Sequence, residues 1–269
     1  MKQVSKLTVG SLFAGIGGFD LGLERTGGFE VKWQVEIDPY CQRVLAKHWP
    51  NVQRYGDIRE VRDAEPVDVI CGGFPCQSVS MAGKREGQDD ERWLWPEFFR
   101  VLCLLRPRYA LIENTAGLAS LGMPDVLRDL ASVGYESEWD VIPAAAVGAP
   151  HLRERIWILA YPASLKRQHG RNGRGYAKDV LPEGAGGNQT QRREDWELIE
   201  LVPGVCLREA ADWWRTQSAV ARSANGLSDW MDRNHAIGNA IVPQIAEWIG
   251  NRILEAESKE PLDKRGAAT

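Results

Sequence analysis

A cysteine that could act as a nucleophile stands directly after an apolar run typical of a buried strand. The run is Val67–Cys71, and Gly72-Gly73-Phe74-Pro75-Cys76-Gln77 follows it. Loops at the carboxyl ends of strands face the ligand in open α/β sheets, and a thiol near a helix N-terminus ionises more easily. Cys76 is therefore a candidate for covalent catalysis through its thiolate. The remaining cysteines are interpreted as small buried hydrophobic residues: Cys41, Cys71, Cys103 and Cys206.

A glycine-rich stretch follows the first predicted strand and indicates a ligand-binding turn. It reads Phe13-Ala14-Gly15-Ile16-Gly17-Gly18, and glycines here would let ligand atoms approach the backbone. The dinucleotide fingerprint would need another glycine where the chain has Asp20, so NAD and FAD are not favoured. Glu36 ends the second predicted strand, where an acid can accept hydrogen bonds from two ribose hydroxyls. These residues favour an adenosine ligand without a pyrophosphate, and a purely structural turn is the alternative.

A glutamate and two arginines add a carboxylate and two guanidinium groups. Glu113 ends the apolar run that starts at Tyr109, which is not typical of a surface glutamate. Arg153 and Arg155 stand two apart in a strand-like stretch, so both side chains are expected on one face. They could hold a base carbonyl oxygen, the carboxylate or a phosphate. The alternative is an Arg/Glu ladder on the surface.

The elements that must position these residues alternate between strand-like and helix-like runs. Such alternation predicts a doubly wound α/β fold, with a mostly parallel sheet and helices on both faces. The predicted strands are residues 6–13, 31–36, 67–71, 109–113, 136–142 and 155–160. Helices are predicted up to Leu23, over 39–48, and as an amphipathic helix ending the stretch 237–254.

Composition narrows the class of protein. The chain has 269 residues, of which 43% are hydrophobic and 26% charged, so a disordered tail protein is excluded. A mean hydropathy of −0.35, without an apolar run long enough to cross a bilayer, argues against a membrane protein. Five cysteines without a CxxC pair predict neither a disulfide framework nor a metal site. No signal peptide is recognised, so a cytoplasmic location is expected.

The α/β pattern stops near Pro162 and gives way to a glycine-rich, basic stretch. The net charge is +5 over residues 163–193, although the whole chain carries −4. A basic segment on an acidic scaffold can dock phosphates, and a solvated loop is the alternative. The expected organisation is a catalytic and cofactor-binding domain, a target-recognition insert, a return to the catalytic domain and a flexible tail. Their residues are 1–161, 162–224, 225–255 and 256–269, respectively.

Five short motifs occur in one order and resemble the DNA cytosine-5 methyltransferase family. They are Phe-x-Gly-x-Gly-Gly at 13–18, Pro-Cys-Gln at 75–77, Glu-Asn-Thr at 113–115, Arg-x-Arg at 153–155 and Gly-Asn-Ala at 238–240. The likeness covers about residues 7–160 and 225–250, and the chain resembles short phage-type or solitary bacterial members of the family. It implies the Rossmann-like class I methyltransferase fold with a small irregular target-recognition insert.

The resemblance implies a reaction as well as a fold. The family transfers a methyl group from S-adenosyl-L-methionine to carbon 5 of a cytosine that is flipped out of double-stranded DNA. Cys76 would add to carbon 6 and so activate carbon 5, which is otherwise a poor nucleophile. Glu113 would hydrogen-bond ring nitrogen 3 and the exocyclic amine. Arg153 and Arg155 would complete the catalytic set.

The resemblance also implies which residues bind the cofactor and the DNA. Glu36 would hold the ribose, Asp57 the adenine amine, and Ile37 would flank the adenine, while Asn239 and Ala240 would close the methionine end. The other expected members of the cofactor pocket are Phe13, Gly15, Gly17, Gly18, Ile58 and Pro75. The expected DNA contacts are Ser80, Lys84, Arg85 and Arg92, near the loop that closes over the flipped base, and Arg171 and Arg174 of the insert.

Two alternatives to DNA methylation stay open. The same constellation can act on a transfer RNA cytosine, and the chain could be a DNA-binding relic without turnover. The basic insert favours DNA, and the intact Cys76, Glu113 and Arg153 argue against a relic. A monomer is expected, while a role in restriction-modification, with a cognate restriction endonuclease as partner, is left open. His151 stands where the family usually has glutamine, so its charge could make DNA binding depend on pH.

Overall fold

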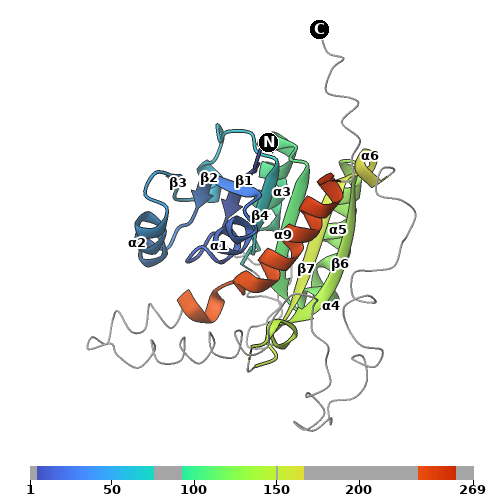
Figure 1. Cartoon of the computed structure of the whole chain (residues 1–269). Helices are drawn as coiled ribbons and strands as arrows, with labels where there is room; N and C mark the ends of the chain where they lie inside the picture. Colours follow the sequence, from blue (N-terminus) through green and yellow to red (C-terminus); the bar gives the residue numbers. More distant parts are fainter. Residues whose placement is uncertain (1–4, 76–92, 150, 167–235, 259–269) are drawn as a thin grey trace.

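A computed structural model describes residues 5–75, 93–149, 151–166 and 236–258. These residues form a seven-stranded sheet in the order β3-β2-β1-β4-β5-β7-β6, flanked by helices (Figure 1). The predicted doubly wound α/β fold is confirmed. The strands are β1 (Leu7–Leu12), β2 (Phe29–Val35), β3 (Gln53–Tyr55), β4 (Val69–Gly72), β5 (Tyr109–Thr115), β6 (Tyr135–Pro143) and β7 (Glu154–Pro162).

The sheet is mostly parallel, as the alternating pattern predicts. Strands β1 to β5 pair in parallel, whereas β7 pairs antiparallel with both β5 and β6. The first residues of β7 therefore lie beside the last residues of β5, with Arg155 opposite Thr115. Gly72, the last residue of β4, is opposite Ile112 of β5. The carboxyl ends of β1, β2, β4 and β5 thus meet the start of β7 at one edge of the sheet.

Helices cover both faces of this sheet. Figure 1 shows α9 running across one face, next to α1. Apolar side chains of α1 and α9 form one core with that face, and those of α3 and α5 form a second core with the other. Within the described ranges, no helix is long and apolar enough to cross a membrane. The helices of eight or more residues are α1 (Gly18–Arg25), α2 (Pro39–His48), α3 (Trp95–Leu105), α5 (Met123–Ser132) and α9 (Pro243–Ser258).

The last helix differs from its predicted bounds. Residues 236–239 are helical, but α9 itself begins at Pro243, a residue that suits the first turn of a helix. It ends at Ser258, so residues 256–258 belong to the helix and not to a flexible tail. Glu257 explains this extension, because its carboxylate accepts from Arg108 Nη2 at 2.6 Å and from the Tyr109 hydroxyl at 2.7 Å.

Asp20, the residue that breaks the dinucleotide fingerprint, is part of the interior. Its side chain is fully buried on α1, and Gln34 of β2 donates to it from Nε2 at 3.2 Å. Burial raises the pKa of Asp20 to about 7. The carboxyl group therefore ties the first turn of α1 to the sheet and does not face the ligand side of the glycine turn.

Candidate active site

The glycine turn between β1 and α1 leaves room for a ligand at one position. Gly15 has a φ of 57°, and a Cβ placed on it would meet nothing within 4 Å. Gly17 and Gly18 serve packing instead, because a Cβ at either would overlap Trp49 or Ile241, respectively. The structure thus separates the predicted glycines into one that borders open space and two that allow close packing.

Glu36 stands next to this turn with its carboxylate held in place. The backbone N–H of Gly15 donates to Oε2 at 2.7 Å, and that of Asp38 donates to Oε1 at 2.8 Å. Burial raises the pKa of Glu36, and the two backbone hydrogen bonds act against that rise. Each carboxylate oxygen can accept a second hydrogen bond. Two adjacent hydroxyl groups, such as those of a ribose, therefore have acceptors in a fixed position.

The other residues predicted to line the cofactor pocket differ in their exposure and backbone conformation. Ile37 is 67% exposed, so its apolar side chain is accessible to a ligand next to Glu36. Asp57 caps a short helical turn by accepting from the backbone N–H of Arg59 at 2.9 Å. Ile58 follows Asp57, and its side chain is buried in the core. Phe13 leaves β1 with a φ of 52°, a strained backbone of the kind that occurs at functional sites.

Glu113, near the end of β5, is the central acid of the site. Its side chain is 12% exposed, and Arg155 of β7 places Nε 3.1 Å from Oε1. Burial raises the pKa of Glu113 to about 7, although the charges of Arg155 and Arg153 oppose the rise. A Cβ on Gly73 would lie 2.7 Å from Glu113 Oε2, so the glycine allows the carboxyl group to reach the loop that follows β4.

That loop is held in place by two contacts of Phe74, one of its ring and one of its carbonyl. The Phe74 ring packs edge-on against Trp93 with the centroids 5.3 Å apart, and the side chain of Asn114 donates to the Phe74 carbonyl at 3.0 Å. Pro75 is partly buried next to this anchor. Cys76 is the following residue in the sequence and lies outside the described residues. Its neighbours on the N-terminal side are therefore fixed directly beside Glu113.

The other described cysteines are unsuited to nucleophilic attack. Burial raises the pKa of Cys41 to about 12, that of Cys71 well above its usual value, and that of Cys103 to a smaller extent. A thiol with a raised pKa carries little thiolate at neutral pH. The interpretation as buried hydrophobic residues is confirmed for Cys41 and Cys71, whereas Cys103 is only partly buried. Cys206, like Cys76, lies outside the described ranges.

Arg153 does not have the predicted geometry. It precedes β7 and has a φ of 39°, so the alternation of side chains along a strand does not apply to it. Its Nη1 donates to the Gly238 carbonyl at 2.7 Å and its Nη2 to the Ala240 carbonyl at 2.8 Å. The two predicted arginines therefore bind different partners: Arg155 pairs with Glu113, and Arg153 holds the Gly-Asn-Ala segment that includes the exposed Asn239.

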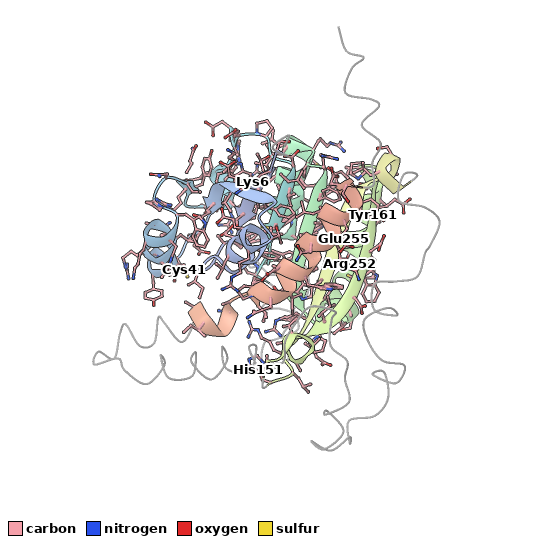
Figure 2. All side chains as sticks on the ribbon, viewed as in Figure 1. Lys6, Cys41, His151, Tyr161, Arg252 and Glu255 are labelled. Carbon is pink, nitrogen blue, oxygen red and sulfur yellow. The ribbon has the colours of Figure 1, made fainter. Side chains whose placement is uncertain are left out.

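The residues expected to contact DNA lie outside the described ranges, so the structure does not place them. His151 is described, and its exposed side chain lies at the end of the molecule where β7 begins (Figure 2). Among the described residues, no group of three His, Cys, Asp or Glu side chains could hold a metal ion. The unplaced residues are Ser80, Lys84, Arg85, Arg92, Arg171 and Arg174.

Comparison with known protein families shows the family of the chain. The family described as C-5 cytosine-specific DNA methylase matches residues 7–194, well over half of the chain. The chain belongs to this family. The match includes the glycine turn, Glu36, Cys76, Glu113 and both arginines, and it ends inside the predicted target-recognition insert.

Individual relatives agree with the family assignment. The Type II methyltransferase M2.BsuMI of Bacillus subtilis is 27% identical over 93% of this chain and 76% of its own length. The Type II methyltransferase M.Bsp6I of Bacillus sp. is 35% identical over 58% of this chain, which spans only 52% of that relative. The solved structure of the methyltransferase EhMeth of Entamoeba histolytica covers 95% of this chain with a TM-score of 0.61 at 14% identity, which shows a shared fold.

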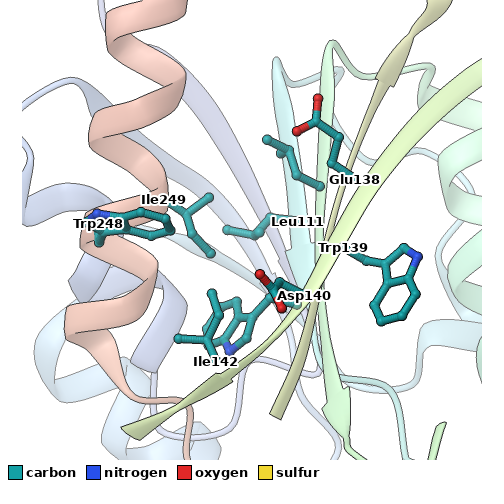
Figure 3. Close-up of a pocket in the computed structure, with 9 residues that line it drawn as sticks. Leu111, Glu138, Trp139, Asp140, Ile142, Trp248 and Ile249 are labelled. Atoms are coloured by element: carbon teal, nitrogen blue, oxygen red, sulfur yellow. The ribbon is translucent and has the colours of Figure 1, made fainter. Parts of the chain in front are cut away.

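A separate pocket in this methylase is distinct from the predicted site. It is a cavity of about 30 Å³ between α9 and strands β5 to β7, enough for one or two water molecules. Figure 3 shows Trp248 and Ile249 of α9 facing Leu111 and Ile142 across it. None of the predicted site residues lines this cavity.

Two residues of the methylase site were not predicted as members. Gly73 makes space for Glu113, and Asn114 holds the loop that precedes Cys76. A sequence signal existed for Asn114, because it is a polar residue in an otherwise apolar strand and is 4% exposed. Gly73 could be suspected only as the second glycine of a pair after a strand.

Proposed function

We propose that the chain transfers a methyl group from S-adenosyl-L-methionine to carbon 5 of a specific cytosine in double-stranded DNA, through a covalent adduct between Cys76 and the flipped base. The observation that carries the proposal is Glu113. It is a buried acid with a pKa raised to about 7, paired with Arg155 and touching the loop that leads to Cys76. An acid that can hold or release a proton near neutral pH suits the protonation of a heterocyclic base.

The proposed roles of the chain's own residues follow from this arrangement. The Cys76 thiolate adds to carbon 6, and the electron density that this addition pushes into the ring is stabilised by Glu113 at nitrogen 3. The resulting enamine has a nucleophilic carbon 5 that would accept the methyl group, with S-adenosyl-L-homocysteine as the leaving group. A base then removes the proton from carbon 5, and elimination of Cys76 restores the aromatic ring. Arg155 keeps Glu113 oriented throughout.

The residues at the glycine turn fit an adenosine moiety. The Glu36 carboxylate is already fixed by two backbone donors, the exposed Ile37 offers an apolar surface, and Gly15 borders open space. When bound, S-adenosyl-L-methionine would supply an electrophilic methyl group on a sulfonium. Glu36 would hold its ribose, Asp57 its adenine amine, and the segment with Asn239 and Ala240 its methionine end.

The proposed activity can be tested with the purified chain and labelled S-adenosyl-L-methionine. Duplex DNA from an unmethylated host should accept label at cytosine carbon 5, whereas a transfer RNA transcript should not. Bisulfite sequencing of DNA from cells that express the chain should show one recurring target sequence. Label in transfer RNA alone would establish the RNA alternative, and no label in either polymer would support a DNA-binding relic.

Glu36→Ala is expected to weaken the binding of S-adenosyl-L-methionine by about 10- to 100-fold, because two charge-assisted hydrogen bonds to the ribose are lost. The affinity for DNA should change less than about twofold, since Glu36 faces the glycine turn. Calorimetry of cofactor binding and a DNA filter-binding assay provide the two numbers. Glu30→Ala is the control and should leave the cofactor affinity unchanged, because Glu30 is an exposed acid of β2 that pairs with Lys32. Unchanged cofactor affinity in Glu36→Ala would remove Glu36 from the pocket.

We further propose that residues 162–224 select the target sequence. Strand β7 ends at Pro162, and the seven-stranded sheet contains no residue that follows it among the described residues. A following insert is therefore not needed to complete the sheet. The segment 163–193 carries +5 on an acidic chain. Replacing 162–224 by the corresponding segment of a relative should change the bisulfite pattern while cofactor affinity stays constant. An unchanged pattern after the exchange would show that another part of the chain reads the sequence.

A further inference from the structure

Arg153 connects two parts of the chain that are far apart in sequence. Its guanidinium donates from Nη1 to the Gly238 carbonyl at 2.7 Å and from Nη2 to the Ala240 carbonyl at 2.8 Å. The two acceptors are backbone carbonyls two residues apart. A planar guanidinium can bond both at once, whereas the single ammonium group of a lysine cannot reproduce the fork.

The segment that Arg153 holds also lies close to two loops that the proposed reaction uses: the glycine turn and the loop that precedes Cys76. A Cβ on Gly18 of the glycine turn would lie 2.7 Å from both Cβ and the carbonyl oxygen of Ile241, the residue that follows Ala240. A Cβ on Gly73 would lie 3.8 Å from Ile241 Cδ1. Ile241 is therefore in contact range of the cofactor turn and of the loop that precedes Cys76, and Arg153 holds the residues directly before it.

The surroundings of Arg153 destabilise its charged form, so other interactions must hold the residue in place. Burial and the like charge of Arg155 lower the pKa of Arg153, and Glu113 partly compensates. Its φ of 39° adds backbone strain. A partly buried guanidinium group with such costs persists when its hydrogen bonds are well formed, and the two carbonyls provide these bonds.

We propose that Arg153 is a positioning residue for the cofactor: it fastens residues 238–241 against the glycine turn and so sets the affinity for S-adenosyl-L-methionine, while Arg155 is the arginine that pairs directly with the Glu113 carboxyl group. This inference rests on the proposed function. It assigns different tasks to two arginines that the sequence pattern treats as one pair.

The test compares Arg153→Lys with Arg155→Lys in the full chain. Arg153→Lys should weaken cofactor binding in calorimetry by roughly tenfold, the equivalent of one charge-assisted hydrogen bond, and should raise KM for the cofactor similarly. Its KM for duplex DNA, and its single-turnover rate at saturating cofactor, should change less than about threefold. Arg155→Lys should show the opposite pattern, with a reduced single-turnover rate and an unchanged cofactor affinity.

Arg106→Lys is the matched control. Arg106 also has a positive φ, of 49°, and also donates to a backbone carbonyl, that of Val133, at 2.7 Å. It lies at the end of α3, and its replacement should leave both parameters unchanged. Ile241→Ala provides a second route, since it should weaken cofactor binding without touching the guanidinium.

Several results would overturn the proposal. Cofactor affinity within twofold of wild type in Arg153→Lys would do so, and so would equal losses of single-turnover rate in the two arginine variants. A variant that lost folded protein instead of cofactor affinity would make Arg153 a folding residue, which also contradicts the proposal. Failure of the proposed function is distinguishable, because the wild-type chain itself would then bind no cofactor or methylate no DNA.

Discussion

Cys76→Ala is expected to abolish methyl transfer to DNA, while the affinity for S-adenosyl-L-methionine stays within about twofold of wild type. Carbon 5 of cytosine becomes nucleophilic only after a thiolate has added to carbon 6, and alanine cannot form that bond. The proposed cofactor contacts include the glycine turn and Glu36 but not the sulfur of Cys76, so cofactor binding is expected to survive its loss. Label transfer to duplex DNA and calorimetry measure the two quantities.

The covalent step has its own signature and its own control. A duplex with 5-fluorocytosine at the target should form a denaturation-resistant adduct with the wild-type chain, because the fluorine blocks the elimination that releases Cys76. Cys76→Ala should form none. Cys103→Ala removes a thiol whose pKa is raised by burial, and it should keep the wild-type adduct yield. Methyl transfer by Cys76→Ala would exclude the cysteine mechanism.

The main strands of the fold could be predicted because each is an apolar run or, in β2 and β6, an alternation of polar and apolar residues. Strand β3 could not, since Gln53–Tyr55 is short and polar and forms a strand only by pairing with β2. Helix α3 is nearly continuous in apolar residues, so its periodicity does not distinguish a buried helix from a strand. Helix α5 did carry a signal, because Met123, Val126 and Leu130 recur at helical spacing and are all buried.

For the site, the sequence predicts which residue types take part but not all of the contacts that they make. The sequence indicates that Glu36 and Glu113 end strands, and parallel pairing then brings both acids to one edge of the sheet. The partner of Arg153 could not be predicted, because its acceptors are backbone carbonyls 85 and 87 residues away. A main-chain acceptor leaves no trace in side-chain patterns. The close approach of Gly73 to Glu113 is hidden because a glycine contributes no side chain to a sequence pattern.

Glu113→Gln is expected to reduce the single-turnover rate of methyl transfer by about 100- to 10,000-fold, the usual loss when a positioned acid is removed. Glutamine keeps the shape and can still donate a hydrogen bond to cytosine, but it has no proton to transfer to nitrogen 3. Rapid-quench measurements with enzyme in excess of duplex DNA isolate this step from product release. Glu154→Gln, which removes an exposed carboxylate from the neighbouring strand, should keep the wild-type rate.

The pH dependence gives a sharper test of Glu113 than the size of the loss. Because burial raises the pKa of this carboxyl group to about 7, it keeps its proton below that pH and releases it as the pH rises. The single-turnover rate should therefore fall on the alkaline side, by up to about tenfold per pH unit once the carboxyl group has ionised. In Glu113→Gln this alkaline decline should disappear, and the residual rate should only increase with pH as Cys76 ionises. An alkaline decline that survives in Glu113→Gln would assign the titration to another group and reduce Glu113 to a structural anchor for Arg155.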